Sequence, residues 1–186
     1  MNEPLFLTPV FQERIWGGTK LNTIFDYEIP NDKTGECWAV SGHPNGQSIV
    51  HNGKYAGQKL NDLWIDHAEL FGDSESDVFP LLTKILDASD DLSVQVHPDD
   101  AYAREFENGE LGKTECWYII DAEPGATLIY GHHAQSREEL RSMIDNGQWD
   151  ELLTKIEVKP GDFFYVPSGT IHALGAGILV LETQQS

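Results

Sequence analysis

Short runs of alternating apolar and polar residues, bounded by glycine and proline, make up most of the chain. Side chains alternate between the two faces of a β-strand, so this period of two predicts strands. The turn signals HPNG, EPGA, KPGD and PSGT separate several of the runs. The predicted strands cover residues 36–41, 46–50, 80–86, 92–97, 114–121, 126–130, 155–158, 162–166, 170–173 and 178–183.

Three segments carry helical signals instead. Residues 61–72 have apolar positions at helical spacing and end in glycine, and residues 98–106 begin with proline and aspartate, as a helix N-terminus does. Ser136 and Glu139 form a capping box before a third helix. We therefore expect a mostly β fold, a β-sandwich or jelly roll with a few short peripheral helices and a helical segment around residues 134–154.

Composition and charge narrow the function classes. The 186 residues, 40% hydrophobic and 23% charged, fit one globular domain. A net charge of −19 argues against binding to nucleic acid or to anionic membranes, and no apolar run approaches the ~18 residues of a membrane span. The acidic run GDSESD at residues 72–77 predicts a solvated loop. Two cysteines, Cys37 and Cys116, and an N-terminus without a secretory pattern predict a cytoplasmic protein.

The candidate chemistry begins in the predicted strand at residues 92–97. Ser93, Gln95 and His97 share one face of it, opposite two valines. A strand that turns one whole face of polar groups inward can coordinate an ion or bind a polar ligand. The next predicted strand repeats the pattern, because its alternation places three residues on one face: Lys113, Glu115 and Trp117.

A hairpin would bring a second histidine to the same place. A three-residue loop at 175–177 pairs residues 170–174 with residues 178–182, so that one face holds Thr170, His172, Val180 and Glu182. Two imidazoles, one carboxylate and one amide could then bind zinc, iron, manganese or nickel. Taken singly, Gln95 and Glu115 also fit structural or exposed positions, and the remaining histidines are interpreted as structural or surface residues.

The segment from Gly161 to His172 matches the second sequence motif of the cupin superfamily, with Pro167, Ser168 and Gly169 between them. The looser first motif, QVH with Glu115 far downstream, resembles the type I mannose-6-phosphate isomerases, also called phosphomannose isomerases. Five blocks are similar to that family in the same order over nearly the whole chain: ERIWGG, GECWAVSGHPNG, PLLTKILDASDDLSVQVHPDD, GKTECWYII and VPSGTIHALGAGILVLETQQS. Without a large helical insertion, the chain is most similar to the short bacterial form.

The resemblance implies a cupin-type jelly roll and a zinc-dependent interconversion of mannose 6-phosphate and fructose 6-phosphate through an enediol. It implies one Zn²⁺ per chain, with four ligands: Gln95, His97, Glu115 and His172. It also implies that Lys113 and Glu182 are catalytic and that Lys84, Ser93 and Glu36 line the sugar-phosphate pocket. Glu182, Lys113 and a zinc-bound water are all candidates for taking the carbon-bound proton. From its own surroundings, Lys84 also fits an edge lysine that reaches solvent.

Members of the family continue beyond the ETQQS block into an arginine-containing segment and a second jelly-roll unit. We therefore expect residues 1–186 to be the N-terminal cupin catalytic domain, with weak or no activity alone. Two other functions stay open: a non-catalytic cupin that binds a metal and a sugar phosphate, and, less favoured, an Fe(II) cupin oxygenase. The expected partner is a small sugar phosphate, and the sequence does not indicate an oligomeric state.

Overall fold

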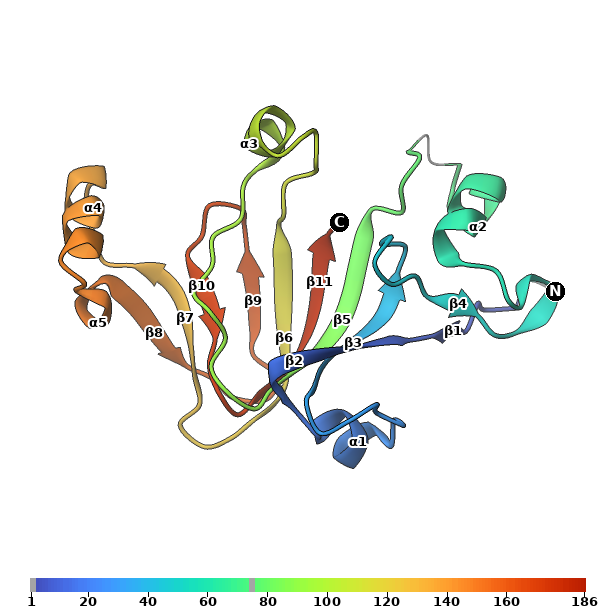
Figure 1. Ribbon diagram of the computed structural model, residues 1–186, viewed down its shortest axis with the longest axis horizontal. Helices are drawn as coiled ribbons and strands as arrows, with labels where there is room; N and C mark the ends of the chain where they lie inside the picture. The colour runs from blue at the N-terminus through green and yellow to red at the C-terminus, as the bar shows by residue number, and fades with distance from the viewer. Residues whose placement is uncertain (1–2, 74–75) are drawn as a thin grey trace.

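Two antiparallel sheets form the body of the protein in the computed structural model, which describes residues 3–73 and 76–186 (Figure 1). The six-stranded sheet has the order β2-β3-β5-β11-β6-β9, and the three-stranded sheet has the order β10-β7-β8. Their bounds are β2 Val10–Gly18, β3 Thr34–Ser41, β5 Leu81–Ala88, β6 Glu115–Ala122, β7 Thr127–His132, β8 Leu153–Glu157, β9 Phe163–Val166, β10 His172–Leu174 and β11 Ile178–Gln185. The two short strands β1 Leu7–Thr8 and β4 Ile49–Val50 pair separately. The predicted mostly β, cupin-type jelly roll is confirmed.

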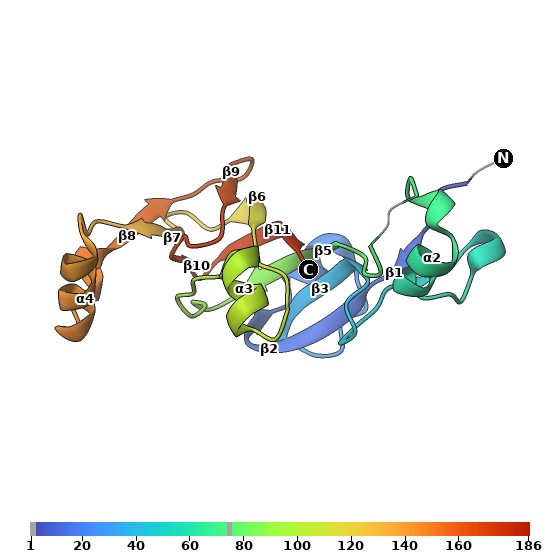
Figure 2. The same ribbon diagram turned by 90° about the horizontal axis from the view of Figure 1, so that it is seen from above.

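The helices are short and lie at the periphery (Figures 1 and 2). They are α1 Lys20–Phe25, α2 Leu60–Asp66, α3 Asp100–Phe106, α4 Arg137–Asp145 and α5 Trp149–Leu152, with 3₁₀ turns at Gly53–Tyr55 and Ala68–Leu70. The three predicted helices are confirmed in α2, α3 and α4, and the Ser136 hydroxyl accepts the Glu139 N–H as the capping box requires. None of the described helices is both long enough and apolar enough to span a bilayer. Part of the acidic run at 72–77, residues 74–75, lies outside the described residues.

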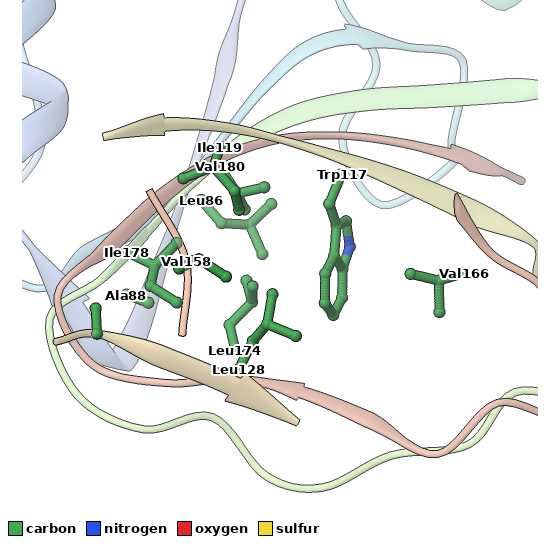
Figure 3. Close-up of a cluster of buried hydrophobic side chains, with 11 residues drawn as sticks. Leu86, Ala88, Trp117, Ile119, Leu128, Val158, Val166, Leu174, Ile178 and Val180 are labelled. Carbon is green, nitrogen blue, oxygen red and sulfur yellow. The ribbon is translucent and has the colours of Figure 1, made fainter. Parts of the chain in front are cut away.

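The main core lies between the two sheets (Figure 3). Alternation turns Trp117, Ile119 and Val180 of the large sheet inward, where they meet Leu128 and Leu174 of the small sheet. All five are at most 2% exposed. This apolar layer fills one end of the space between the sheets. The polar residues farther along the same strands face the rest of that space.

The predicted strand at residues 92–97 is wrong as a regular element. Leu92 N–H donates to the Leu174 carbonyl, and Gln95 exchanges both backbone hydrogen bonds with His172. Residues 92 and 95 are three positions apart, whereas their partners on β10, residues 174 and 172, are two positions apart. The extra residue in the segment interrupts the β-ladder. The segment lies beside β10 as an irregular chain with Val94 and Val96 exposed.

The predicted hairpin at residues 175–177 is also wrong. Leu174 pairs with Leu128 of β7, whereas Ile178 pairs with Ala88 of β5 and Ala122 of β6. The three residues cross from one sheet to the other, and a side chain at Gly175 would meet the Thr127 carbonyl oxygen at 2.1 Å. His172 and Glu182 still face the same interior, because the two sheets face each other rather than because the strands pair.

Candidate metal centre

A cavity of about 180 Å³ opens on the inner face of the large sheet. Acidic and basic side chains from five strands of this sheet, or from the ends of those strands, point toward the cavity because side chains alternate along a strand. They are Arg14, Glu36, Lys84, Lys113, Glu115 and Glu182. The small sheet closes the opposite side with His172, and residues 92–95 contribute Ser93 and Gln95. The cavity thus gathers nearly all of the predicted site residues; His97 is not on its wall but joins the group beside it described next.

His97, Glu115 and His172 form a compact group whose ligand atoms all lie within 4.8 Å of one another. His172 Nε2 is 3.3 Å from Glu115 Oε1, and His97 Nε2 is 3.7 Å from Glu115 Oε2. Glu115 begins β6, His172 begins β10, and His97 ends the irregular segment that bridges to β10. Three separate segments of the chain therefore converge on one point.

The chemistry of this group fits a divalent metal ion. The Nδ1 of His172 lies 2.8 Å from the Thr170 carbonyl oxygen, which can only accept, so Nδ1 carries the proton and Nε2 presents its lone pair. Burial, followed by the charges of Lys113 and His172, lowers the pKa of His97 to about 4, so this imidazole is neutral near pH 7. The two buried carboxylate oxygens of Glu115 face the two imidazoles, and Lys113 Nζ lies 2.8 Å from Oε2. Neutral imidazoles and a carboxylate are typical zinc ligands.

Gln95 and Ser93 lie on the cavity wall beside this group. The Gln95 side-chain N–H donates to the Ser93 hydroxyl at 3.2 Å. The amide oxygen, the atom that a metal would use, is not engaged in this bond. The role of Gln95 as a fourth ligand stays a prediction.

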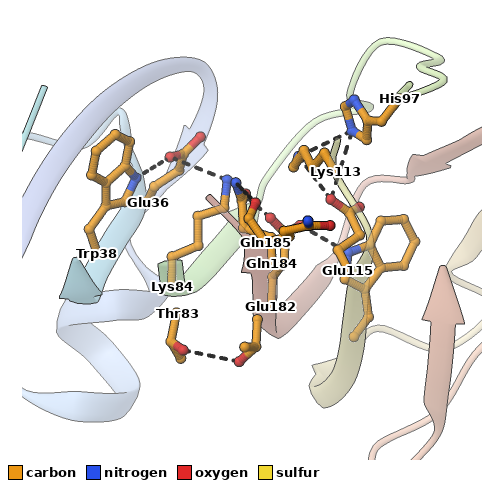
Figure 4. Close-up of polar contacts among 12 residues, drawn as sticks. Glu36, Trp38, Thr83, Lys84, His97, Lys113, Glu115, Glu182, Gln184 and Gln185 are labelled. Atoms are coloured by element: carbon orange, nitrogen blue, oxygen red, sulfur yellow. Dashed lines mark hydrogen bonds and ion pairs between the residues drawn. The ribbon is translucent and has the colours of Figure 1, made fainter. Parts of the chain in front are cut away.

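A row of charged and aromatic side chains crosses the sheet next to the metal group (Figure 4). Trp38, Lys84, Glu182 and Trp117 occupy successive register positions on β3, β5, β11 and β6. Lys84 Nζ lies 3.1 Å from Glu182 Oε1 and 3.9 Å from Glu36 Oε2. The Trp117 indole N–H donates to Glu182 Oε2 at 2.9 Å. Neighbouring positions on one face of the sheet explain this order.

The electrostatics of the row keep Lys84 and Glu182 charged. Burial alone would raise the pKa of Glu182, but the Lys84 and Lys113 ammonium groups hold it below its ordinary value. Burial alone would lower the pKa of Lys84, but the carboxylates of Glu182 and Glu36 hold it above its ordinary value. Each member of the pair therefore compensates the burial of the other.

Lys113 lies between this row and the metal group. Its Nζ is 2.8 Å from Glu115 Oε2 and 3.1 Å from His97 Nε2, and its backbone N–H donates to the Pro98 carbonyl. Burial, followed by the charge of Glu182, raises the pKa of Glu115 in spite of Lys113. A cation beside this carboxylate therefore stabilises its ionised form.

Three residues of the cavity region were not predicted. Arg14 and Trp16 come from β2, and the Trp38 indole N–H donates to Glu36 Oε2 at 2.5 Å. The signal for the first two was present, since Gln12, Arg14 and Trp16 alternate with Glu13 and Ile15. This run was not predicted as a strand, because charged residues and glycines are uncommon in strands.

Comparison with known proteins gives consistent results. Residues 5–121 match the family model described as phosphomannose isomerase type I, catalytic domain. The mannose-6-phosphate isomerase ManA of Bacillus subtilis is 66% identical over 184 residues, which is 99% of this chain and 58% of that protein.

Two solved structures are also similar. The crystal structure of the Bacillus subtilis mannose 6-phosphate isomerase has a TM-score of 0.97 at 61% identity, and the match covers 99% of this chain and 59% of that one. A mannose 6-phosphate isomerase structure bound with zinc and yttrium shares the fold at 16% identity, with a TM-score of 0.72, covering 97% of this chain and 67% of that one. The chain thus spans about 58% of the length of the curated relatives it matches.

Proposed function

Because this chain belongs to the family of type I phosphomannose isomerases, we propose that its cavity is the zinc-dependent site of an aldose–ketose isomerase. The reaction is the interconversion of mannose 6-phosphate and fructose 6-phosphate through an enediol. One observation carries the proposal: the His97–Glu115–His172 group and the buried Lys84–Glu182 ion pair lie beside the same cavity. Metal ligands next to an ionised carboxylate are the arrangement that a proton transfer beside a carbonyl needs.

His97, Glu115 and His172 would hold one Zn²⁺ per chain, with Gln95 as the fourth ligand. A zinc ion held there supplies Lewis acidity to the oxygens of the substrate. Support comes from the Thr170 carbonyl, which orients His172, and from the buried Glu115 carboxylate, whose two oxygens face the two imidazoles.

Glu182 takes the proton from C2. The C2–H bond breaks, its electron pair forms the C1–C2 double bond, and the π pair of the C1 carbonyl moves to O1. A hydroxyl proton then moves from O2 to O1, the C2 carbonyl forms, and Glu182 returns its proton to C1. Its depressed pKa, caused by Lys84 and Lys113 against the opposing effect of burial, keeps it ionised and ready to accept. The Trp117 indole fixes its other oxygen.

Lys113 stabilises the oxyanion that develops as C2 loses its proton. Its ammonium is within reach of the metal group, 2.8 Å from Glu115 Oε2. A cation held next to a developing negative charge lowers the activation barrier, because it stabilises the atom on which that charge appears in the transition state. Glu36 and Ser93 line the pocket around the substrate.

We further propose that residues 1–186 form the N-terminal cupin catalytic domain of the protein, with a small sugar phosphate as its ligand. A cytoplasmic location stays the prediction from the sequence.

The test is to load the 186-residue chain with zinc and follow mannose 6-phosphate in D₂O by NMR. The same chain joined to the remaining part of Bacillus subtilis ManA provides a second length. Fructose 6-phosphate formation with deuterium at C1 supports the proposal. Binding of sugar phosphate by both forms without turnover would favour the non-catalytic cupin, and oxygen consumption with Fe(II) would favour the oxygenase.

A further inference from the structure

Three cationic side chains of the described residues line the cavity, and each of them is paired with a buried carboxylate. Lys84 is bound to Glu182 at 3.1 Å, and Lys113 is bound to Glu115 at 2.8 Å. The three acids of the cavity, with Glu36 as the third, balance the three cations one for one. A dianionic ligand in a chain of net charge −19 therefore needs a cation with donors still available.

Arg14 is that cation. Its Nε donates to Glu36 Oε1 at 2.9 Å, and its Nη1 donates to the Glu13 carbonyl at 2.9 Å. A guanidinium has five N–H donors, and within residues 3–73 and 76–186 these two bonds are the ones it makes. Its side chain is 35% exposed, against 11% for that of Lys84. Arg14 thus lines the cavity with unused donors and is more exposed than Lys84.

Glu36 holds the guanidinium in place. One carboxylate oxygen accepts from Arg14. The other accepts from the Trp38 indole and lies 3.9 Å from Lys84 Nζ (Figure 4). The side chain of Glu36 is only 8% exposed. Because both of its oxygens are bound, the Glu36 carboxylate has little rotational freedom. It therefore holds the planar guanidinium of Arg14 preorganised for a ligand that accepts two hydrogen bonds.

Arg14 and the metal group lie at opposite ends of the cavity. Arg14 is on β2 and Glu115 is on β6, with β3, β5 and β11 between them. Four strand spacings separate the two backbones by about 19 Å along the sheet. The distance between the functional groups is shorter, because the side chains on both strands reach into the cavity. A hexose 6-phosphate carries its phosphoryl group at one end and its reacting carbons at the other, so the two ends need separate parts of the cavity wall.

We propose that Arg14 receives the phosphoryl group of the substrate and is the residue that distinguishes a sugar phosphate from the free sugar. This inference rests on the proposed function, since it assumes that the reacting carbons lie at the metal group. Glu36 and Trp38 act through Arg14 as positioning residues.

The test compares Arg14→Gln with Arg14→Lys in the zinc-loaded chain. Arg141→Gln is the matched control, because the Arg141 side chain is 84% exposed on α4. Affinities for mannose 6-phosphate and for free mannose are measured by NMR titration, with zinc content and thermal unfolding as checks of the fold. We expect Arg14→Gln to weaken mannose 6-phosphate binding about ten- to a hundredfold, since it removes charge-assisted hydrogen bonds. Free mannose should bind as it does to the wild type, and Arg14→Lys should lie between the two.

Equal losses for phosphorylated and free sugar would overturn the inference, because Arg14 would then act only through Glu36. If Arg14→Gln fails to fold, the same comparison is made with Arg14→Lys, which keeps the charge and loses the fork. Arg14-dependent binding without isomerisation, in the chain and in its ManA-extended form alike, would refute the proposed function but leave Arg14 as the residue that receives the phosphoryl group. Isomerisation with unchanged selectivity in Arg14→Gln would refute only the inference, and a wild type that binds no mannose 6-phosphate would refute both.

Discussion

Lys84 and Glu182 face each other across β5 and β11, with Lys84 Nζ 3.1 Å from Glu182 Oε1. Their side chains are 11% and 4% exposed, so the pair is an internal ion pair in the middle of the sheet. Each charge makes the burial of the other tolerable, and together they keep an ionised carboxylate next to the metal group.

Replacing Lys84 with Met leaves Glu182 buried without its main partner. We expect a loss of about 3–5 kcal/mol in the free energy of unfolding at pH 7, because an uncompensated buried charge remains. Chemical denaturation of the wild type and of Lys84→Met measures it.

The pH dependence follows from the same pair. In the wild type, Glu182 has a depressed pKa, so its contribution to stability is present above the ordinary glutamate pKa and is lost as the pH falls through the folded value. In Lys84→Met, burial should raise that pKa, so the contribution is present at low pH and lost as the pH rises. The stability difference should therefore narrow below about pH 4.3. Adding Glu182→Gln should recover most of the loss at pH 7, and a double variant as unstable as Lys84→Met would contradict this account.

The metal group predicts which histidines matter for zinc. Replacing either His97 or His172 with Ala should remove most of the bound zinc, because each supplies one of the converging ligand atoms. Metal analysis of the purified variants checks this, with His132→Ala as the control outside the group. Full zinc occupancy in the His97→Ala, His172→Ala double variant would refute the assignment of these residues as zinc ligands.

Gln95 provides a separate test of the fourth ligand. Its amide oxygen is not used by the Ser93 hydrogen bond, so Gln95→Leu removes a donor atom and leaves the three other ligands. We expect zinc affinity to fall about tenfold or more, measured by competition with a chelator. An unchanged affinity would restrict Gln95 to lining the cavity.

Lys113 should affect turnover rather than metal content. Lys113→Met keeps the length of the side chain and removes its charge, so turnover of mannose 6-phosphate by the ManA-extended chain should fall about a hundredfold or more with zinc retained. The exposed Lys155→Met is the matched control, since Lys155 pairs with Asp150 at the surface. Wild-type turnover in Lys113→Met would show that this lysine only neutralises Glu115.

Strand alternation predicted the wall of the cavity because it depends only on local geometry. Lys113, Glu115 and Trp117 face inward together, as their spacing indicated. Arg14 was missed because β2 is paired with β3 through an irregular register that the sequence does not reveal. Trp38 was missed as a partner of Glu36 because a side-chain hydrogen bond depends on rotamers, which the sequence pattern does not encode.

One error in the fold concerns the partners of two strands rather than the strands themselves. His172 and Glu182 were expected on one hairpin, but β10 and β11 belong to different sheets. A glycine-rich link such as 175–177 fits both a tight turn and a crossing between sheets. The strand pairings that decide between the two involve residues distant in the sequence: Leu128 pairs with β10, and Ala88 and Ala122 pair with β11.

The central claim is that zinc held by His97, Glu115 and His172 supports the isomerisation. The most direct test removes zinc with a chelator and returns it stepwise while mannose 6-phosphate turnover is followed, in the chain and in its ManA-extended form. We predict that turnover disappears with the zinc and returns in proportion to added zinc, up to one equivalent per chain, and that the His97→Ala, His172→Ala double variant shows no return. Full turnover in the chelated protein, or none at any zinc content in either form, would contradict the claim.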